Sequence, residues 1–181
     1  MLLPPLGLYI HLPWCERKCP YCDFNSHESH SIPEEQYVRA LLQDLRDDLP
    51  LVQGRTIATL FIGGGTPSLF SASAINQLLL GIAALVPLAP TLEATMEANP
   101  GSAEADKFRA FREAGINRLS LGIQSFDDAQ LQALGRVHTR DQALAAIEFA
   151  RAAGFDSVNL DLMHGLPGQS LRGAENDLLI A

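Results

Sequence analysis

A repeat of one helix end followed by one strand constrains the fold of this chain more than any other feature. Residues 112–121, REAGINRLSL, match residues 151–160, RAAGFDSVNL, in the order of their polar, glycine and apolar positions. The copies begin at Arg112 and Arg151, 39 residues apart, which is about the length of one helix, one strand and their loops. Such repetition is typical of stacked strand–helix units, and it predicts an α/β barrel or part of one.

Short apolar runs between longer helical patterns extend this alternation along the chain. An alternation of strands and helices favours a parallel sheet with helices packed against it. We expect its strands at residues 8–12, 59–62, 92–97, 118–122 and 157–162.

The helix boundaries carry their own signals. Ser31 with Glu34, and Thr139 with Gln142, have the spacing of a capping box, in which side chains and backbone N–H groups bond reciprocally. Polar residues and glycines predict the remaining boundaries. These are Ser71 and Ser102 as N-caps, Gly115 and Gly154 at helix ends, and Ser170 before a last helix.

Length and charge limit the class of protein. At 181 residues the chain is long enough for one domain with a proper core. A net charge of -8 argues against a nucleic-acid-binding surface, which needs a basic face. The first residues lack the basic start of a signal peptide, and no run approaches the roughly 20 apolar residues of a spanning helix. We expect a cytoplasmic protein, with peripheral contact to a membrane left open.

Three cysteines, Cys15, Cys19 and Cys22, are the only ones in the chain, and their spacing is C-x3-C-x2-C. Iron–sulfur clusters normally take four protein thiolates, so a cluster held by three keeps one iron open for another ligand. The alternative is a zinc site completed by His27 or His30, although structural zinc sites usually pair C-x2-C units. A disulfide framework is disfavoured because the number of cysteines is odd.

Distinctive residues follow the expected strands one after another. In α/β barrels the functional groups gather at the carboxyl ends of the strands. The glycines of residues 63–67, GGGTP, allow a close backbone approach to a ligand, although a tight turn explains them equally. Glu97 and Asp161 end apolar strands, so a hydroxyl, ammonium or guanidinium group should meet each carboxylate. The alternative is a structural salt bridge with Arg118 or Arg136.

Other polar side chains in this zone have less definite roles. Gln124 suits a ribose or an amino group, with a satisfied core glutamine as the alternative, and Arg136 is able to hold a carboxylate. His11 is expected to be a satisfied barrel histidine. His138 and His164 lie near the expected rim without an assigned role.

Six segments in register resemble one family, the radical S-adenosylmethionine (SAM) group that contains oxygen-independent coproporphyrinogen III oxidase and the HemW-type haem chaperones. The resemblance runs essentially the whole length of the chain. The segments are residues 9–15 (YIHLPWC), 15–22 with the three cysteines, 63–67 (GGGTP), 97–100 (EANP), 122–126 (GIQSF) and 161–170 (DLMHGLPGQS).

The resemblance implies a partial (β/α)6 barrel of the radical SAM type, here with about five strand–helix units. It implies a [4Fe-4S] cluster on Cys15, Cys19 and Cys22, with SAM on the open iron as the source of a 5′-deoxyadenosyl radical. Carried over position by position, the residues that match the family's SAM-contacting places are Tyr9, Tyr21, Gly64, Gly65, Thr66, Glu97, Gln124, Arg136 and Asp161.

Two departures favour the haem chaperones over the oxidases. The oxidases resemble C-x3-C-x2-C-x-C, whereas Phe24 stands at the last cysteine position here, and they carry a long extension before the cluster. The resemblance then implies haem as cargo and haemoproteins as acceptors. The alternative is an enzyme that decarboxylates two propionates of coproporphyrinogen III. We interpret residues 1–181 as an incomplete radical SAM core that lacks a sixth strand and a C-terminal domain, because its apolar end has no C-cap.

Overall fold

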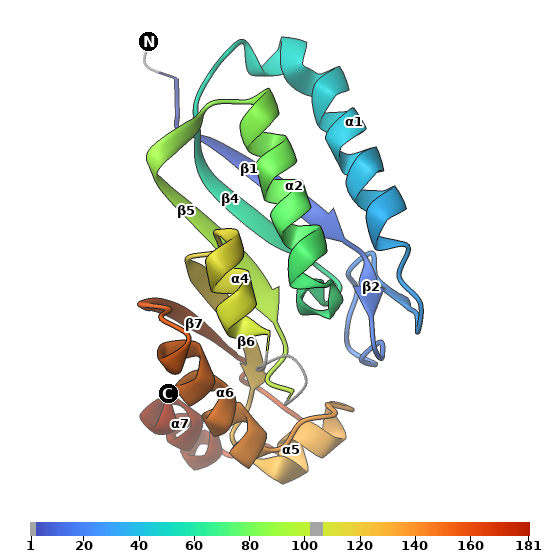
Figure 1. The fold of residues 1–181 in the computed structure, drawn as a ribbon. Coiled ribbons are helices and arrows are strands. Elements are labelled where there is room, and N and C mark those ends of the chain that lie inside the picture. The colour runs from blue at the N-terminus through green and yellow to red at the C-terminus, as the bar shows by residue number, and fades with distance from the viewer. Residues whose placement is uncertain (1–2, 102–106) are drawn as a thin grey trace.

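Five parallel strands lie side by side in the order in which they follow one another along the chain. The computed structural model describes residues 3–101 and 107–181 (Figure 1). Every neighbouring pair of strands in the main sheet is parallel, as expected when a helix returns the chain between strands. The sheet consists of β1 (Leu6–Leu12), β4 (Ile57–Gly64), β5 (Leu88–Ala98), β6 (Arg118–Gln124) and β7 (Ser157–Leu162).

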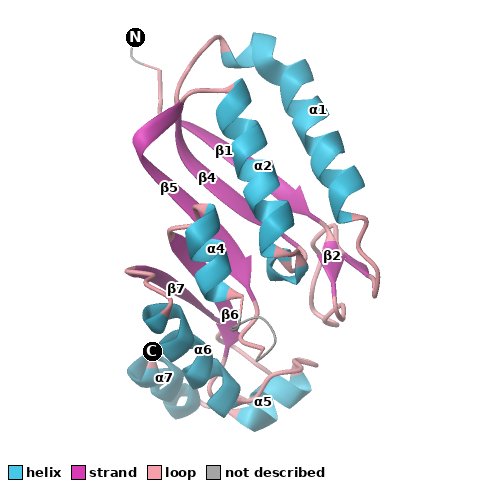
Figure 2. Cartoon of the chain, in the orientation of Figure 1, coloured by secondary structure: helices cyan, strands magenta, loops and turns pink. Residues whose placement is uncertain are grey.

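Helices cover one face of this sheet (Figure 2). Successive helices α1, α2, α4 and α6 pack against one another along that face, so each strand–helix unit leans on the next. The helices are α1 (Glu34–Val52), α2 (Ala72–Leu85), α4 (Phe108–Ala114), α5 (Asp128–Ala133), α6 (Arg140–Ala152) and α7 (Leu171–Ile180), with a short 3-10 helix, η1 (Pro67–Leu69).

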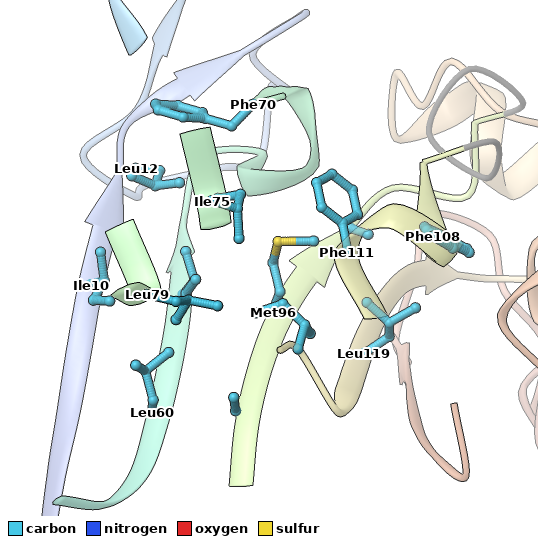
Figure 3. Packing of buried hydrophobic residues seen from close by; sticks show 14 of the residues in the cluster. Ile10, Leu12, Leu60, Phe70, Ile75, Leu79, Met96, Phe108, Phe111 and Leu119 are labelled. Atoms are coloured by element: carbon cyan, nitrogen blue, oxygen red, sulfur yellow. The ribbon is translucent and has the colours of Figure 1, made fainter. Parts of the chain in front are cut away.

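The core lies between the sheet and these helices (Figure 3). Because strand side chains alternate between faces, Leu119, Leu121 and Ile123 of β6 are fully buried against the helices. The alternate residues of β6, Ser120, Gly122 and Gln124, face the concave side. The helix side of the sheet is therefore apolar, and polar side chains of β6 lie on its other face.

The predicted α/β class with a parallel sheet is confirmed, and each of the five predicted strands is present. The caps at Ser71 and Thr139 and the helix after Ser170 are also confirmed, as is the left-handed backbone of Gly115 and Gly154. Ser102 lies outside the described residues.

The prediction of a capping box between Ser31 and Glu34 is wrong. Helix α1 begins at Glu34 after Pro33, without a side-chain cap. The carboxylate of Glu34 instead accepts hydrogen bonds from the backbone N–H (2.8 Å) and the hydroxyl of Ser71, at the start of α2. A contact between two helix starts therefore replaced the local bond that the spacing predicted.

The loop after β1 contains two short strands that the sequence did not indicate, β2 (Trp14–Cys15) and β3 (His27–Glu28). They form a small parallel pair beside the main sheet. Among residues 3–101 and 107–181, no helix combines the length and the apolar character needed to cross a membrane.

Candidate cofactor site

A cavity of about 370 Å³ opens at the carboxyl ends of the strands. Its wall is formed by the loop after β1 and by the ends of β4, β5, β6 and β7. It brings together all the residues predicted to bind a cluster or SAM except Tyr9. Those in the wall are Cys15, Cys19, Cys22, Tyr21, Gly64, Gly65, Thr66, Glu97, Gln124, Arg136 and Asp161.

Backbone pairing at its base and side-chain hydrogen bonds to its carbonyl oxygens hold the cysteine loop, residues 15–25. The β2–β3 pair closes its base, with Cys15 opposite Glu28. The ammonium of Lys18 donates to the carbonyl oxygens of Phe24 (3.3 Å) and Ser26 (3.1 Å). His11 Nε2 donates to Asn25 O at 2.8 Å, which ties the loop to β1. Because a carbonyl oxygen only accepts, this bond places the proton of a neutral His11 on Nε2.

The three thiols are free, with Cys15 buried and the other two half-buried. Three sulfur donors from one loop on one cavity wall suit an iron–sulfur cluster chemically. Within the described parts of the chain, no three His, Cys, Asp or Glu side chains already lie at the distances of a metal site. Cluster binding on these cysteines therefore stays a prediction.

Gly64, the last residue of β4, and Gly65, which follows it, let neighbouring parts of the chain come close. A Cβ atom on Gly65 would lie 2.5 Å from the carbonyl oxygen of Trp14, and one on Gly64 would lie 2.7 Å from the His11 ring. Gly64 also has φ of 118°, which L side chains rarely adopt. The groups that approach these glycines belong to the chain itself: the Trp14 backbone in β2 for Gly65 and the His11 ring in β1 for Gly64. The sequence alone had left open whether a ligand or a tight turn explains the glycines.

Glu97 lies at the end of β5, where its Oε2 accepts a hydrogen bond from Gly64 N at 3.1 Å. Burial raises the pKa of the Glu97 carboxyl, and nearby Asp161 raises it further. The Gly64 hydrogen bond and His11 act in the opposite direction. A half-buried carboxylate with a raised pKa is poised to accept a cationic ligand.

Asp161 has neutral partners. It accepts from the Ser120 hydroxyl (3.1 Å) and from Asn159 Nδ2 (2.7 Å). The alternative of a salt bridge from Arg118 or Arg136 is not seen: the ion pairs among the described residues are Arg39–Glu35 and Arg151–Glu148, both on helix surfaces.

Arg136 connects the cysteine loop to the strand ends. One terminal nitrogen donates to Asn99 Oδ1 (2.7 Å) and Gly122 O (2.8 Å). The other lies 3.6 Å from Cys19 Sγ and 3.5 Å from the Tyr21 hydroxyl. Its Nε is buried and has no hydrogen-bond partner. An unused buried donor in a guanidinium at the cavity wall fits an anionic ligand.

Tyr9 is placed differently from the other predicted residues. Its ring is 58% exposed on the concave face and stacks on Phe61, with ring centroids 6.2 Å apart. Its hydroxyl donates to His11 Nδ1 at 2.9 Å. Tyr9 therefore supports the histidine that holds the cysteine loop, and its contact with SAM stays a prediction.

Several residues of the site were not found from the sequence. Asn99 holds Arg136, and Ser120 and Asn159 hold Asp161. Alternation along β6 and β7 places Ser120 and Asn159 on the concave face, so a stricter use of that pattern would have found them. The expected satisfied state of His11 is confirmed, and His27, His30 and His164 are exposed.

Known proteins with related sequences and folds agree with this arrangement. The model of the radical SAM superfamily matches residues 9–179. The haem chaperone HemW of Escherichia coli is 55% identical over 97% of this chain and 47% of HemW. HemW of Haemophilus influenzae is 54% identical over 97% of this chain and 47% of its own length. The solved structure of E. coli coproporphyrinogen III oxidase, HemN, superposes with a TM-score of 0.87 at 32% identity, over 97% of this chain and 41% of HemN.

The chain thus spans about half the length of the curated relatives it matches. The family model covers nearly all of it, and the match includes the cysteine loop and every strand end that lines the cavity. By sequence and by fold, this chain belongs to the radical SAM superfamily.

Proposed function

We propose that this chain is the radical SAM core of a haem chaperone of the HemW type, which binds haem and passes it to haemoproteins in the cytoplasm. The observation that carries the proposal is the 55% identity to E. coli HemW along 97% of the chain. The acidic net charge of -8 agrees with a partner other than nucleic acid. Peripheral contact with a membrane remains compatible with this role.

The cavity residues fit the two cofactors of the family. Cys15, Cys19 and Cys22 would hold a [4Fe-4S] cluster and leave one iron open. A reduced cluster with bound SAM supplies a 5′-deoxyadenosyl radical. Residues proposed to bind SAM are Tyr9, Tyr21, Gly64, Gly65, Thr66, Glu97, Gln124, Arg136 and Asp161.

The charged residues of the cavity support two distinct roles in binding SAM. Glu97 offers a half-buried carboxylate that accepts from an ammonium group, and Asp161 offers oxygens that are already oriented by Ser120 and Asn159. Arg136 offers a buried N–H to a carboxylate, while Asn99 and Gly122 O keep its guanidinium in place. An amino acid head group such as that of SAM carries both charges.

A second candidate function is the oxidative decarboxylation of coproporphyrinogen III. It is supported by the TM-score of 0.87 to HemN. Against it stands Phe24, which lines the cavity at the position where the oxidases are expected to carry a further cysteine. Identity of 32% to HemN, against 55% to HemW, also favours the chaperone.

The test uses the full-length protein, reconstituted anaerobically with iron and sulfide. One sample receives reductant, SAM and coproporphyrinogen III, and mass spectrometry looks for the loss of two carboxyl groups. A parallel sample is titrated with haem. We expect stoichiometric haem binding and no decarboxylated product. Product formed over many turnovers would establish the oxidase and overturn the chaperone proposal.

A further inference from the structure

Gln124 has a backbone conformation that is unusual for its residue type. It closes β6 with φ of 68°, and Gln53 at the end of α1 is the other described non-glycine residue with positive φ. The N–H of Ser125 donates to Ile123 O at 2.9 Å, so Gln124 is the centre of a tight three-residue turn. A side chain in the left-handed region is strained, and it persists only where surrounding contacts hold it. The turn directs Gln124 to the cavity wall.

The carbonyl oxygen of Ile123 accepts a second hydrogen bond, from His138. The His138 ring is 3% exposed, and its Nε2 lies 3.0 Å from Ile123 O. Because a carbonyl oxygen only accepts, Nε2 carries the hydrogen and Nδ1 carries none. Nδ1 is buried and has no partner. A buried ring nitrogen without a partner is costly, so the Nε2 bond is the single polar interaction that explains an imidazole at this position.

Separate hydrogen bonds hold Gln124 and the two residues that follow it. The carboxylate of Asp177, on α7, accepts from Ser125 Oγ (2.8 Å) and from Phe126 N (2.7 Å). Met163 N donates to Gln124 O at 2.9 Å. These bonds hold the residues at and after the turn. Among the described side chains, His138 is the one bonded to the carbonyl that begins it.

We propose that His138 is a positioning residue for the SAM site, which acts through the carbonyl of Ile123 to hold Gln124 in its left-handed turn at the cavity wall. The inference rests on the proposed binding of SAM by Gln124. His138 does not line the cavity, so its effect on SAM is indirect. His138 lies in the segment between α5 and α6, which begins at Arg140. Arg136 of the same segment donates to Gly122 O, next to the turn.

The positioning role of His138 requires a hydrogen-bond donor at the position of its Nε2. Substitutions that keep, move or remove this donor therefore test it. The amide nitrogen of His138→Gln reaches about as far as Nε2, whereas that of His138→Asn reaches only about as far as Nδ1. His138→Leu removes the donor and keeps an apolar side chain of similar size. The Asn variant is the matched control, because it is polar like Gln and differs in reach.

The experiment uses full-length protein and two readouts. SAM affinity is measured by calorimetry on protein reconstituted anaerobically with its cluster. Amide hydrogen exchange of the peptide covering residues 119–127 is measured by mass spectrometry without SAM. Loss of one hydrogen bond predicts about tenfold weaker SAM binding and about tenfold faster exchange in the Asn and Leu variants. The Gln variant should stay within about twofold of the wild type in both.

The exchange readout separates this proposal from the proposed function. Unchanged exchange in the Asn and Leu variants would overturn the role of His138, whatever happens to SAM. Changed exchange in a protein whose wild type binds no SAM would support the positioning role and contradict the SAM assignment.

The wild-type protein gives a check that needs no substitution. Nitrogen NMR of the His138 ring should show the hydrogen on Nε2. A hydrogen on Nδ1 would overturn the proposal even if every variant failed to fold.

Discussion

At the scale of single residues, the Glu97 carboxylate lies in a position that costs the folded state stability. Burial raises the pKa of Glu97, against the hydrogen bond from Gly64 N and the nearby His11, and no ion pair of Glu97 is seen among the described residues. Above its ordinary pKa, ionised Glu97 therefore destabilises the folded state, and this cost is absent at low pH. A half-buried carboxylate that weakens its own fold is expected where a cationic ligand will meet it.

The substitution Glu97→Gln separates the effect of this carboxylate on stability from its effect on SAM binding. At neutral pH we expect the cluster-free variant to melt a few degrees higher, as roughly 1 kcal/mol would produce, because no charge is buried. SAM binding should weaken about tenfold or more, because the charge-assisted hydrogen bond is lost. Melting curves and SAM titration check the two effects. Glu93→Gln, an exposed carboxylate of the same strand, is the control. A lower melting temperature in Glu97→Gln would contradict this account.

His138 gives the fold a dependence on pH with the opposite sign. Burial lowers the pKa of His138 to about 4, and Arg136 lowers it as well, against the hydrogen bond to Ile123 and the charge of Asp128. Between pH 6.5 and about 4, the unfolded chain binds a proton at this position and the folded chain does not. Stability should therefore fall with falling pH in this window, by up to about 1.4 kcal/mol per pH unit.

Urea unfolding of the cluster-free protein at about pH 7 and about pH 5 measures this loss. The comparison is with His138→Gln, which keeps the hydrogen bond and cannot titrate. We expect the wild type to lose more stability than the variant between the two pH values. Equal losses would show that the folded His138 titrates near its ordinary pKa.

At the scale of elements, Ser71 joins two helices. Its hydroxyl accepts from Ala74 N as the cap of α2 and donates to Glu34 at the start of α1. Ser71→Ala should lose the cap and this bond, for a cost of roughly 1–2 kcal/mol. Ser73→Ala, at an exposed position inside α2, should stay near the wild type. Urea unfolding of both variants measures the difference, and equal stabilities would remove Ser71 from this role.

The same residue shows what sequence could and could not predict. Alternation of apolar residues and the glycine and cap positions predicted all five strands and the carboxyl-end location of the site, because these patterns are local. The partner of Glu34 was predicted wrongly because Ser71 competes with Ser31 only in the folded molecule. Asp177 and His138 were assigned no role for the same reason. Their hydrogen bonds reach Phe126 and Ile123 across 51 and 15 residues.

At the scale of the whole molecule, the cysteine loop contacts both the first strand of the sheet and the segment after α5. It leaves β1, the first strand, where His11 Nε2 bonds Asn25 O. On the other side it meets the segment after α5, where Arg136 approaches Cys19 Sγ and a Cβ on Gly135 would lie 2.9 Å from Pro20. Strands β4 and β5 separate β1 from β6 in the sheet, so the loop contacts parts of the fold that are not neighbours in the sheet. A cluster on these cysteines would thus be held by a loop that is bonded to both parts of the fold.

Cluster loading should accordingly stabilise the entire protein, since a ligand that binds only the folded state shifts the unfolding equilibrium. We expect anaerobic reconstitution to raise the melting temperature of the wild-type full-length protein. Cys19→Ala should keep the far-ultraviolet circular dichroism of the wild type, because Cys19 is half-buried and outside the core. After reconstitution, Cys19→Ala should contain neither the sulfide nor the iron of the cluster and should show no rise in melting temperature. The reason is that two thiolates do not hold a four-iron cluster firmly. Asp23→Ala, an exposed residue of the same loop, should keep all three. A complete cluster in Cys19→Ala would show that Cys19 is not a ligand.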